Sequence, residues 1–171
     1  RKIKIGFLSG DLRQHSVNFF LKDVVSKINK DEFHIVALSN LEINRQHETI
    51  TGFYKKHFDD WFDVIDLTDE DLITLVRSLN LDILIDLNGF TYGNRVNILA
   101  ARSAKIQIGW CGYNNSLGIK NMDYIIADKN LIKKNEESLY KEKIISLPNI
   151  WNAMTKPENL PEINELPYKT N

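Results

Sequence analysis

A histidine, an arginine and an aspartate lie close together in SGDLRQHSVNFFL, residues 9–21. An apolar segment, IKIGFL, precedes them, and a segment with apolar residues at helical spacing follows. An imidazole at the end of a strand and the start of a helix is placed to act as a general base. His15 is therefore a candidate catalytic residue. The spacing also allows another interpretation, in which His15 caps the helix or packs against Phe19.

Asp11, four residues before His15, offers carboxylate chemistry. A carboxylate after a first strand can accept a phosphoryl group or bind a metal ion, but such sites usually use a second nearby carboxylate. The SGDLR loop contains no second carboxylate. Asp11 is therefore a candidate substrate-binding residue of the His15 loop or, alternatively, a turn residue.

Two further loops combine glycine with hydrogen-bonding side chains. NGFTYGNR (88–95) has glycines where a tight turn or a close backbone approach to a ligand would need them. WCGYNNSLG (110–118) mixes aromatic rings and amides, as carbohydrate and peptide sites do. Both compositions are equally typical of plain turns. The candidate substrate-binding residues in these loops are Asn88, Gly89, Thr91, Tyr113, Asn115 and Gly118.

Alternating strand and helix patterns must position these loops. Short apolar runs predict strands at 2–8, 32–39, 61–67, 82–87, 105–112, 122–128 and 143–148. Helical spacing or capping predicts helices at 16–28, 50–57, from Thr68 to about Leu79, and at 95–102, with part of 129–142 helical. The charged run 133–143 is interpreted as a solvated helix face.

This alternation predicts an α/β fold, Rossmann-like, with a mostly parallel sheet and helices on both faces. Ligands of such sheets gather at the carboxyl ends of the strands, where residues 9–16, 88–95 and 112–121 would meet. We expect one lobe over residues 1–148. Residues 149–171 hold three of the four prolines and little periodicity, and we expect a linker or tail there.

Composition excludes several classes of function. The chain has 171 residues and a net charge of −1, without a basic field that would suit nucleic acid. Its one cysteine, Cys111, excludes an internal disulfide and sites built on several cysteines, and favours a reducing, cytoplasmic compartment. No apolar run reaches membrane-spanning length, and no carboxylates or histidines have metal-ligand spacing. We therefore expect no metal, nucleic-acid or membrane partner.

The order of five segments resembles the catalytic region of the O-linked N-acetylglucosamine transferase and SPINDLY family of protein glycosyltransferases. The matching segments, which run from residue 2 to residue 148, are IGFLSGDLRQHSVNFFL, DEFHIVALS, LDILIDLNGFTYGNR, AARSAKIQIGWCGYNNSLGIKNMDYIIAD and EKIISLP. The HSV triplet and Asn115 are more similar to the SPINDLY branch, whose plant members transfer fucose.

The resemblance implies the N-terminal lobe of a two-lobed GT-B enzyme with its active site between the lobes. The position of the histidine proposed as catalytic base in this family matches His15. The enzyme would move N-acetylglucosamine or fucose from UDP-GlcNAc or GDP-fucose, as substrate, to Ser or Thr of an acceptor protein or peptide, without a cofactor. The nucleotide sugar would be bound mostly by a C-terminal lobe, and tetratricopeptide repeats normally precede the catalytic region.

The sequence departs from the family pattern at three positions. Ser103 and Lys105 replace two prolines of an R-P-A-P motif, and Asn114 replaces the proline of GYP. The 171 residues also include neither the repeats nor a second lobe. We expect a piece of a longer enzyme that is inactive alone. The alternative is a non-catalytic Rossmann-like module that binds a peptide or a sugar.

Overall fold

The computed structural model describes residues 1–42, 44, 49–157 and 162. Seven parallel strands form one sheet in the order β3-β2-β1-β4-β5-β6-β7. The strands are β1 (Ile3–Ser9), β2 (Phe33–Ser39), β3 (Asp60–Asp63), β4 (Ile83–Asp86), β5 (Ile106–Gly109), β6 (Tyr124–Asp128) and β7 (Lys143–Leu147). The predicted parallel sheet is confirmed.

β1 lies inside the sheet, between β2 and β4, and is apolar on both faces. Ile5 pairs with Ile35 on one side and with Ile83 on the other. Phe7 and Leu8 are both buried, although consecutive side chains of a strand point to opposite faces. Each face of β1 must therefore be covered by other elements.

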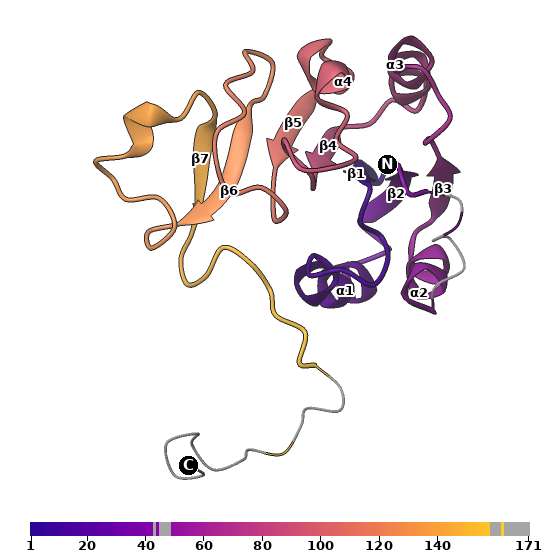
Figure 1. Cartoon of the computed structure of the whole chain (residues 1–171), viewed down its shortest axis with the longest axis horizontal. Coiled ribbons are helices and arrows are strands. Elements are labelled where there is room, and N and C mark those ends of the chain that lie inside the picture. Colours follow the sequence, from indigo (N-terminus) through magenta and orange to yellow (C-terminus); the bar gives the residue numbers. More distant parts are fainter. Residues whose placement is uncertain (43, 45–48, 158–161, 163–171) are drawn as a thin grey trace, which may run out of the picture.

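Two pairs of helices cover the two faces (Figure 1). The helices are α1 (Asn18–Lys27), α2 (Thr49–His57), α3 (Asp69–Ser78) and α4 (Val96–Ala100). Leu21 and Tyr54, from α1 and α2, pack with Phe7 in one apolar cluster. Val76 and Ile98, from α3 and α4, belong to a second cluster that contains Leu8. Helices on both faces of the sheet are therefore confirmed.

The connection between β6 and β7 differs from the prediction. Within 129–142 the structure has only η2, a single 3₁₀ turn over Glu137–Leu139, so the expected helix is wrong. The segment is mostly charged and lacks a repeating apolar stripe that could bury a helix against the sheet. The interpretation as a solvated face also fails at its end, where Glu142 is only 5% exposed.

The segment after β7 has neither helix nor strand over residues 149–157, but its beginning is held against the sheet. The Trp151 N–H donates to Asp128 at 2.8 Å, and the Trp110 indole N–H donates to the Trp151 carbonyl at 3.0 Å. Trp151 also packs against Phe20 of α1. Residues 158–161 and 163–171 of the expected tail lie outside the described residues.

Candidate active site

The loops that follow β1, β4 and β5 meet at the carboxyl edge of the sheet, around a cavity of about 210 Å³. The loop after β1 contributes Asp11 and His15, the loop after β4 contributes Thr91, and the loop after β5 contributes Gly112. The side chain of His15 is 34% exposed, so the imidazole is accessible from solvent. The structure thus brings His15 together with two of the other candidate residues, Asp11 and Thr91.

His15 lies in the turn that leads into α1. Its carbonyl accepts the Asn18 N–H at 3.0 Å, and its Nδ1 lies 3.4 Å from the Val17 N–H. The nearest charged group is Asp11, whose Oδ1 lies 3.7 Å from the same Nδ1. The imidazole therefore combines a local backbone contact, as in the capping interpretation, with a place in the cavity.

Asp11 is buried, with 7% of its surface exposed. Its N–H donates to Ser9 Oγ at 2.9 Å, which is the turn contact that the sequence allowed. Its Oδ1 forms an ion pair with Arg13 at 3.0 Å, and its Oδ2 accepts from Asn88 Nδ2 at 3.1 Å. Both carboxylate oxygens therefore already have partners within the lobe.

Asn88 connects the loop after β4 to the loop after β1. It is 1% exposed, and its Oδ1 accepts the Gly10 N–H at 2.8 Å. Its Nδ2 lies 3.2 Å from both Thr91 Oγ1 and the Tyr92 carbonyl. An amide with this many partners inside the protein positions backbone and neighbouring side chains, and two members of this group, Thr91 and Tyr92, line the cavity.

A buried carboxylate holds the base of the same loop. Asp86, 3% exposed, accepts the Gly89 N–H at 2.7 Å and the Asn88 N–H at 3.4 Å. Burial raises the pKa of Asp86 to about 6, although these two backbone hydrogen bonds oppose the shift. The carboxylate is thus mostly ionised at neutral pH, and its hydrogen bonds fix the turn that presents Asn88.

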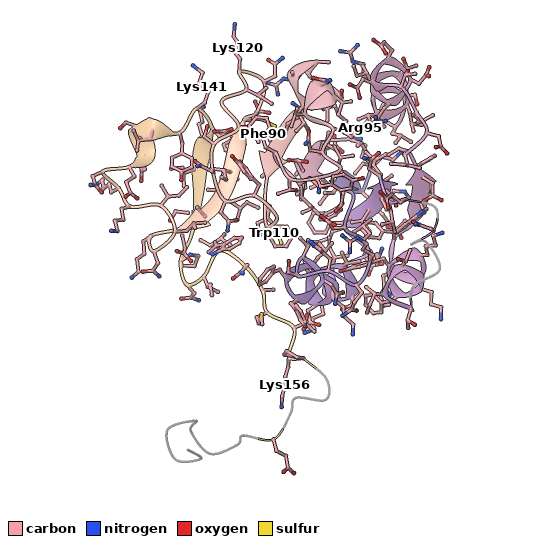
Figure 2. The ribbon with its side chains drawn as sticks, viewed as in Figure 1. Phe90, Arg95, Trp110, Lys120, Lys141 and Lys156 are labelled. Carbon is pink, nitrogen blue, oxygen red and sulfur yellow. The ribbon has the colours of Figure 1, made fainter. Side chains whose placement is uncertain are left out.

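Arg95 holds the far end of the same loop. Its guanidinium donates to the carbonyls of Val64 and Leu67 and lies 3.4 Å from Asp69. These contacts join the start of α4 to the turn after β3. Arg95 (labelled in Figure 2) therefore supports the loop from outside the cavity.

The glycines of these loops permit close packing. Gly89 has φ +56°, and a Cβ there would lie 2.2 Å from the Tyr113 side chain. A Cβ on Gly112 would lie 1.8 Å from the Leu87 carbonyl oxygen. Gly89 is therefore needed for packing against Tyr113, and Gly112 for the contact between the loops after β4 and β5.

Tyr113, Asn115 and Gly118 belong to a different part of the edge and do not line the His15 cavity. The Tyr113 ring packs edge-on against Phe90 at 5.7 Å, and Asn115 is exposed. Gly118 has φ +66°, as a turn requires. Among the described residues, the cavity and these three candidates thus form separate groups.

The sequence alone did not identify the residue that holds the segment containing Tyr113, Asn115 and Gly118. Buried Glu142 accepts the Ser116 hydroxyl at 2.6 Å and the Leu117 N–H at 2.8 Å. Glu142 belongs to a charged run, which predicts a solvated face. Only the position of Glu142 directly before a strand could have indicated a buried role.

Seven cavity residues lie outside the candidate set: Arg13, Ser16, Val17, Phe20, Tyr92, Cys111 and Gly112. Arg13 and Tyr92 belong to loops that topology already indicated. Cys111 has φ +78°, and burial raises the pKa of its thiol to about 12. The thiol thus stays protonated at neutral pH and is a packing group rather than a nucleophile.

The described residues lack two structural features. They contain no group of three or more His, Cys, Asp or Glu side chains arranged to hold a metal ion. They also contain no helix with the length and apolar character needed to cross a membrane.

The family model for glycosyl transferase family 41 matches residues 1–164. The chain belongs to this family. The match includes every loop of the cavity, so His15 and its neighbours are part of the family region.

Individual relatives agree with this assignment. "Probable UDP-N-acetylglucosamine--peptide N-acetylglucosaminyltransferase SPINDLY" of Solanum lycopersicum is 27% identical over 160 residues, which cover 91% of this chain and 17% of the relative. The corresponding SEC protein of Arabidopsis thaliana is 26% identical over 153 residues, covering 88% and 15%. This family-41 chain therefore spans less than a fifth of the length of these relatives.

A solved structure has the same fold. A mutant of Thermobaculum terrenum O-GlcNAc transferase superposes with a TM-score of 0.89 and 31% sequence identity, covering 96% of this chain and 31% of that one. The resemblance to the O-GlcNAc transferase and SPINDLY family, and the Rossmann-like lobe expected from it, are confirmed.

Proposed function

We propose that residues 1–148 form the N-terminal catalytic lobe of an inverting protein O-glycosyltransferase. The enzyme moves a sugar from a nucleotide sugar to a serine or threonine hydroxyl of an acceptor protein or peptide. The observation that carries this proposal is the placement of an accessible imidazole in a cavity at the carboxyl edge of a family-41 lobe. The non-catalytic alternative, a module that binds a peptide or a sugar, would use the cavity but gives the imidazole no role, whereas transfer needs a base beside the acceptor.

The reaction needs one proton transfer and one displacement. The acceptor hydroxyl oxygen attacks the anomeric carbon and forms the new C–O bond, while the bond to the nucleoside diphosphate breaks and its electron pair leaves with the phosphate. His15 takes the hydroxyl proton or orients the hydroxyl, and is the catalytic residue of this lobe. Attack opposite to the leaving group inverts the anomeric configuration.

UDP-GlcNAc is the donor that we favour over GDP-fucose, and no cofactor is needed. The names of the SPINDLY and SEC relatives both include UDP-N-acetylglucosamine. Most of the nucleotide sugar would be bound by a C-terminal lobe, since the cavity of about 210 Å³ is smaller than the 300 Å³ or more of typical ligand pockets. The buried thiol of Cys111 and the absence of other cysteines favour the cytoplasm.

An enzyme assay tests this function. The longest protein that contains residues 1–171 is incubated with a serine- and threonine-containing acceptor peptide and, separately, with UDP-GlcNAc or GDP-fucose. Mass spectrometry of the peptide is expected to show addition of N-acetylhexosamine. Addition of deoxyhexose alone would overturn the donor assignment. An unmodified peptide with both donors, from a folded protein that binds the peptide, would support the non-catalytic binding module instead.

A further inference from the structure

Asp11 occupies the position between His15 and Asn88. Its Oδ1 lies 3.7 Å from His15 Nδ1, and its Oδ2 lies 3.1 Å from Asn88 Nδ2. The Asp11 side chain is only 10% exposed, so few water molecules compete for either oxygen. Arg13, 3.0 Å from Oδ1, keeps a positive charge beside the carboxylate. The two oxygens therefore face chemically different partners.

The surroundings of Asn88 fix the direction of its amide. The Gly10 N–H, a pure donor, lies 2.8 Å from one end, which must therefore be the oxygen. The other end then carries the hydrogens and faces the Asp11 oxygen and the Tyr92 carbonyl, both acceptors at neutral pH. Asn88 consequently requires an acceptor at the Oδ2 position of residue 11.

His15 has two possible tautomers in this setting. A bare Nδ1 would accept the Val17 N–H at 3.4 Å and leave the proton on Nε2. A protonated Nδ1 would instead face the Asp11 carboxylate at 3.7 Å. At 3.7 Å this contact is longer than a hydrogen bond, but the attraction between an N–H group and a carboxylate charge extends beyond that distance, and catalytic contacts often shorten when substrate binds. The carboxylate thus favours the proton on Nδ1 and a lone pair on Nε2.

We propose that Asp11 is a positioning residue that holds the His15 proton on Nδ1, and that Asn88 determines which Asp11 oxygen faces the imidazole. This inference rests on the proposed function, because a bare Nε2 is what a base for the acceptor hydroxyl needs. It assigns Asp11 and Asn88 a role within the lobe in place of direct contact with substrate.

The substitution Asp11→Asn tests the arrangement with an almost unchanged shape. Asn88 and Arg13 both donate to residue 11, at 3.1 and 3.0 Å, so the new amide oxygen can accept from only one of them, and neither orientation gives His15 a carboxylate. Without the carboxylate, the Val17 N–H favours a bare Nδ1 and a proton on Nε2, where the imidazole is no longer a base. We expect the ¹⁵N resonances of His15 in the 171-residue chain to change from a protonated Nδ1 to a protonated Nε2. In the active enzyme, kcat should fall about 100-fold, the scale of losing a general base, with KM nearly unchanged.

The chain offers a matched control. Asp60→Asn alters an aspartate that lies 2.6 Å from His34, far from the cavity at the amino edge of the sheet. This variant should leave the His15 resonances and kcat unchanged. An equal loss of kcat in both variants would overturn the proposal, because it would show a general effect of lost charge.

The wild-type spectrum keeps the proposal testable even where Asp11→Asn fails to fold. A neutral His15 with a bare Nδ1 and a protonated Nε2 in the unmodified chain would overturn it directly. The spectrum is independent of turnover. A protonated Nδ1 in a protein that transfers no sugar would support the positioning role of Asp11 and contradict the proposed function. A protonated Nε2 in a protein that does transfer sugar would contradict the positioning role and support the proposed function.

Discussion

Two aspartate–histidine pairs lie at opposite edges of the same sheet. At the amino edge, His34 and Asp60 join neighbouring strands β2 and β3 with a contact of 2.6 Å, and the Asp60 side chain is 46% exposed. At the carboxyl edge, His15 and Asp11 are 3.7 Å apart, the aspartate is 10% exposed, and a cavity adjoins them. The tighter pair is thus the more solvated one.

Under the proposed function, the pair with the longer contact is the functional one, so a short contact is not the deciding feature. An exposed ion pair competes with water and contributes little free energy. The Asp11 carboxylate, in contrast, is desolvated and held by Asn88, so its orientation is fixed. The neighbouring cavity is the place where, in the proposed function, the acceptor hydroxyl meets His15.

The two ends of β4 repeat this contrast. Asp82, just before the strand, lies 2.8 Å from Lys105 and 2.7 Å from Arg1. Hydrogen bonds from Lys105 and from the Lys4 N–H hold the pKa of Asp82 well below its usual range. Asp86, at the end of the strand, has a raised pKa because burial outweighs its backbone hydrogen bonds. The charges at the amino edge therefore stabilise the fold, whereas the buried charge of Asp86 at the carboxyl edge destabilises it.

The largest effect on folding is expected at the contact between the loops of the carboxyl edge. In Gly112→Ala the new Cβ would lie 1.8 Å from the Leu87 carbonyl oxygen, so the backbone must move. We expect the free energy of unfolding, measured with urea, to fall by about 3 kcal/mol. Gly52→Ala is the control, because no atom lies within 4 Å of its new Cβ in α2. This control should gain up to about 1 kcal/mol from helix propensity, and an equal loss in both variants would contradict the packing argument.

A somewhat smaller effect should distinguish the two ends of β4 by pH. The folded pKa of Asp86, about 6, lies above its unfolded value of about 3.9. The folded state therefore binds the proton more tightly, and the contribution of this group is complete below pH of about 4 and lost as pH rises to about 6. Relative to wild type, Asp86→Asn should gain about 2–3 kcal/mol in unfolding free energy over that window, because two pKa units correspond to about that energy.

Asp82→Asn should show the opposite sign in the same urea experiments. The lowered pKa of Asp82 means that its contribution is present above the unfolded value of about 3.9 and is lost as pH falls below it. Parallel pH profiles for the two variants would contradict the contrast between the two edges.

The sequence predicted the sheet and the cavity loops well for identifiable reasons. The apolar run of β1 is buried on both faces, and β4 has one buried face and one half-buried face of isoleucines, so hydrophobicity locates both strands. Parallel strands then bring the loops that follow them to one edge, which is why His15 and Thr91 meet. The position of His15 in the sequence made it a candidate, and the family resemblance added its match to the proposed catalytic base.

What could not be predicted depends on contacts between distant segments. The direction of the Asn88 amide is set by Gly10, 78 positions away in the chain. Glu142 looks like one of many surface charges until the loop at Ser116 is seen to bond to it. Tyr113, Asn115 and Gly118 share a motif with Gly112 but diverge from the cavity, because the backbone turns after Cys111 at φ +78°.

The most direct test of the account compares its two histidines in the active enzyme. His15→Ala removes the imidazole at the cavity, and His34→Ala removes the one at the amino edge. The account predicts that His15→Ala lowers kcat at least ~100-fold, the scale of losing a general base, while His34→Ala retains nearly full turnover. Unchanged turnover in a folded His15→Ala enzyme, or equal losses in both variants, would contradict it.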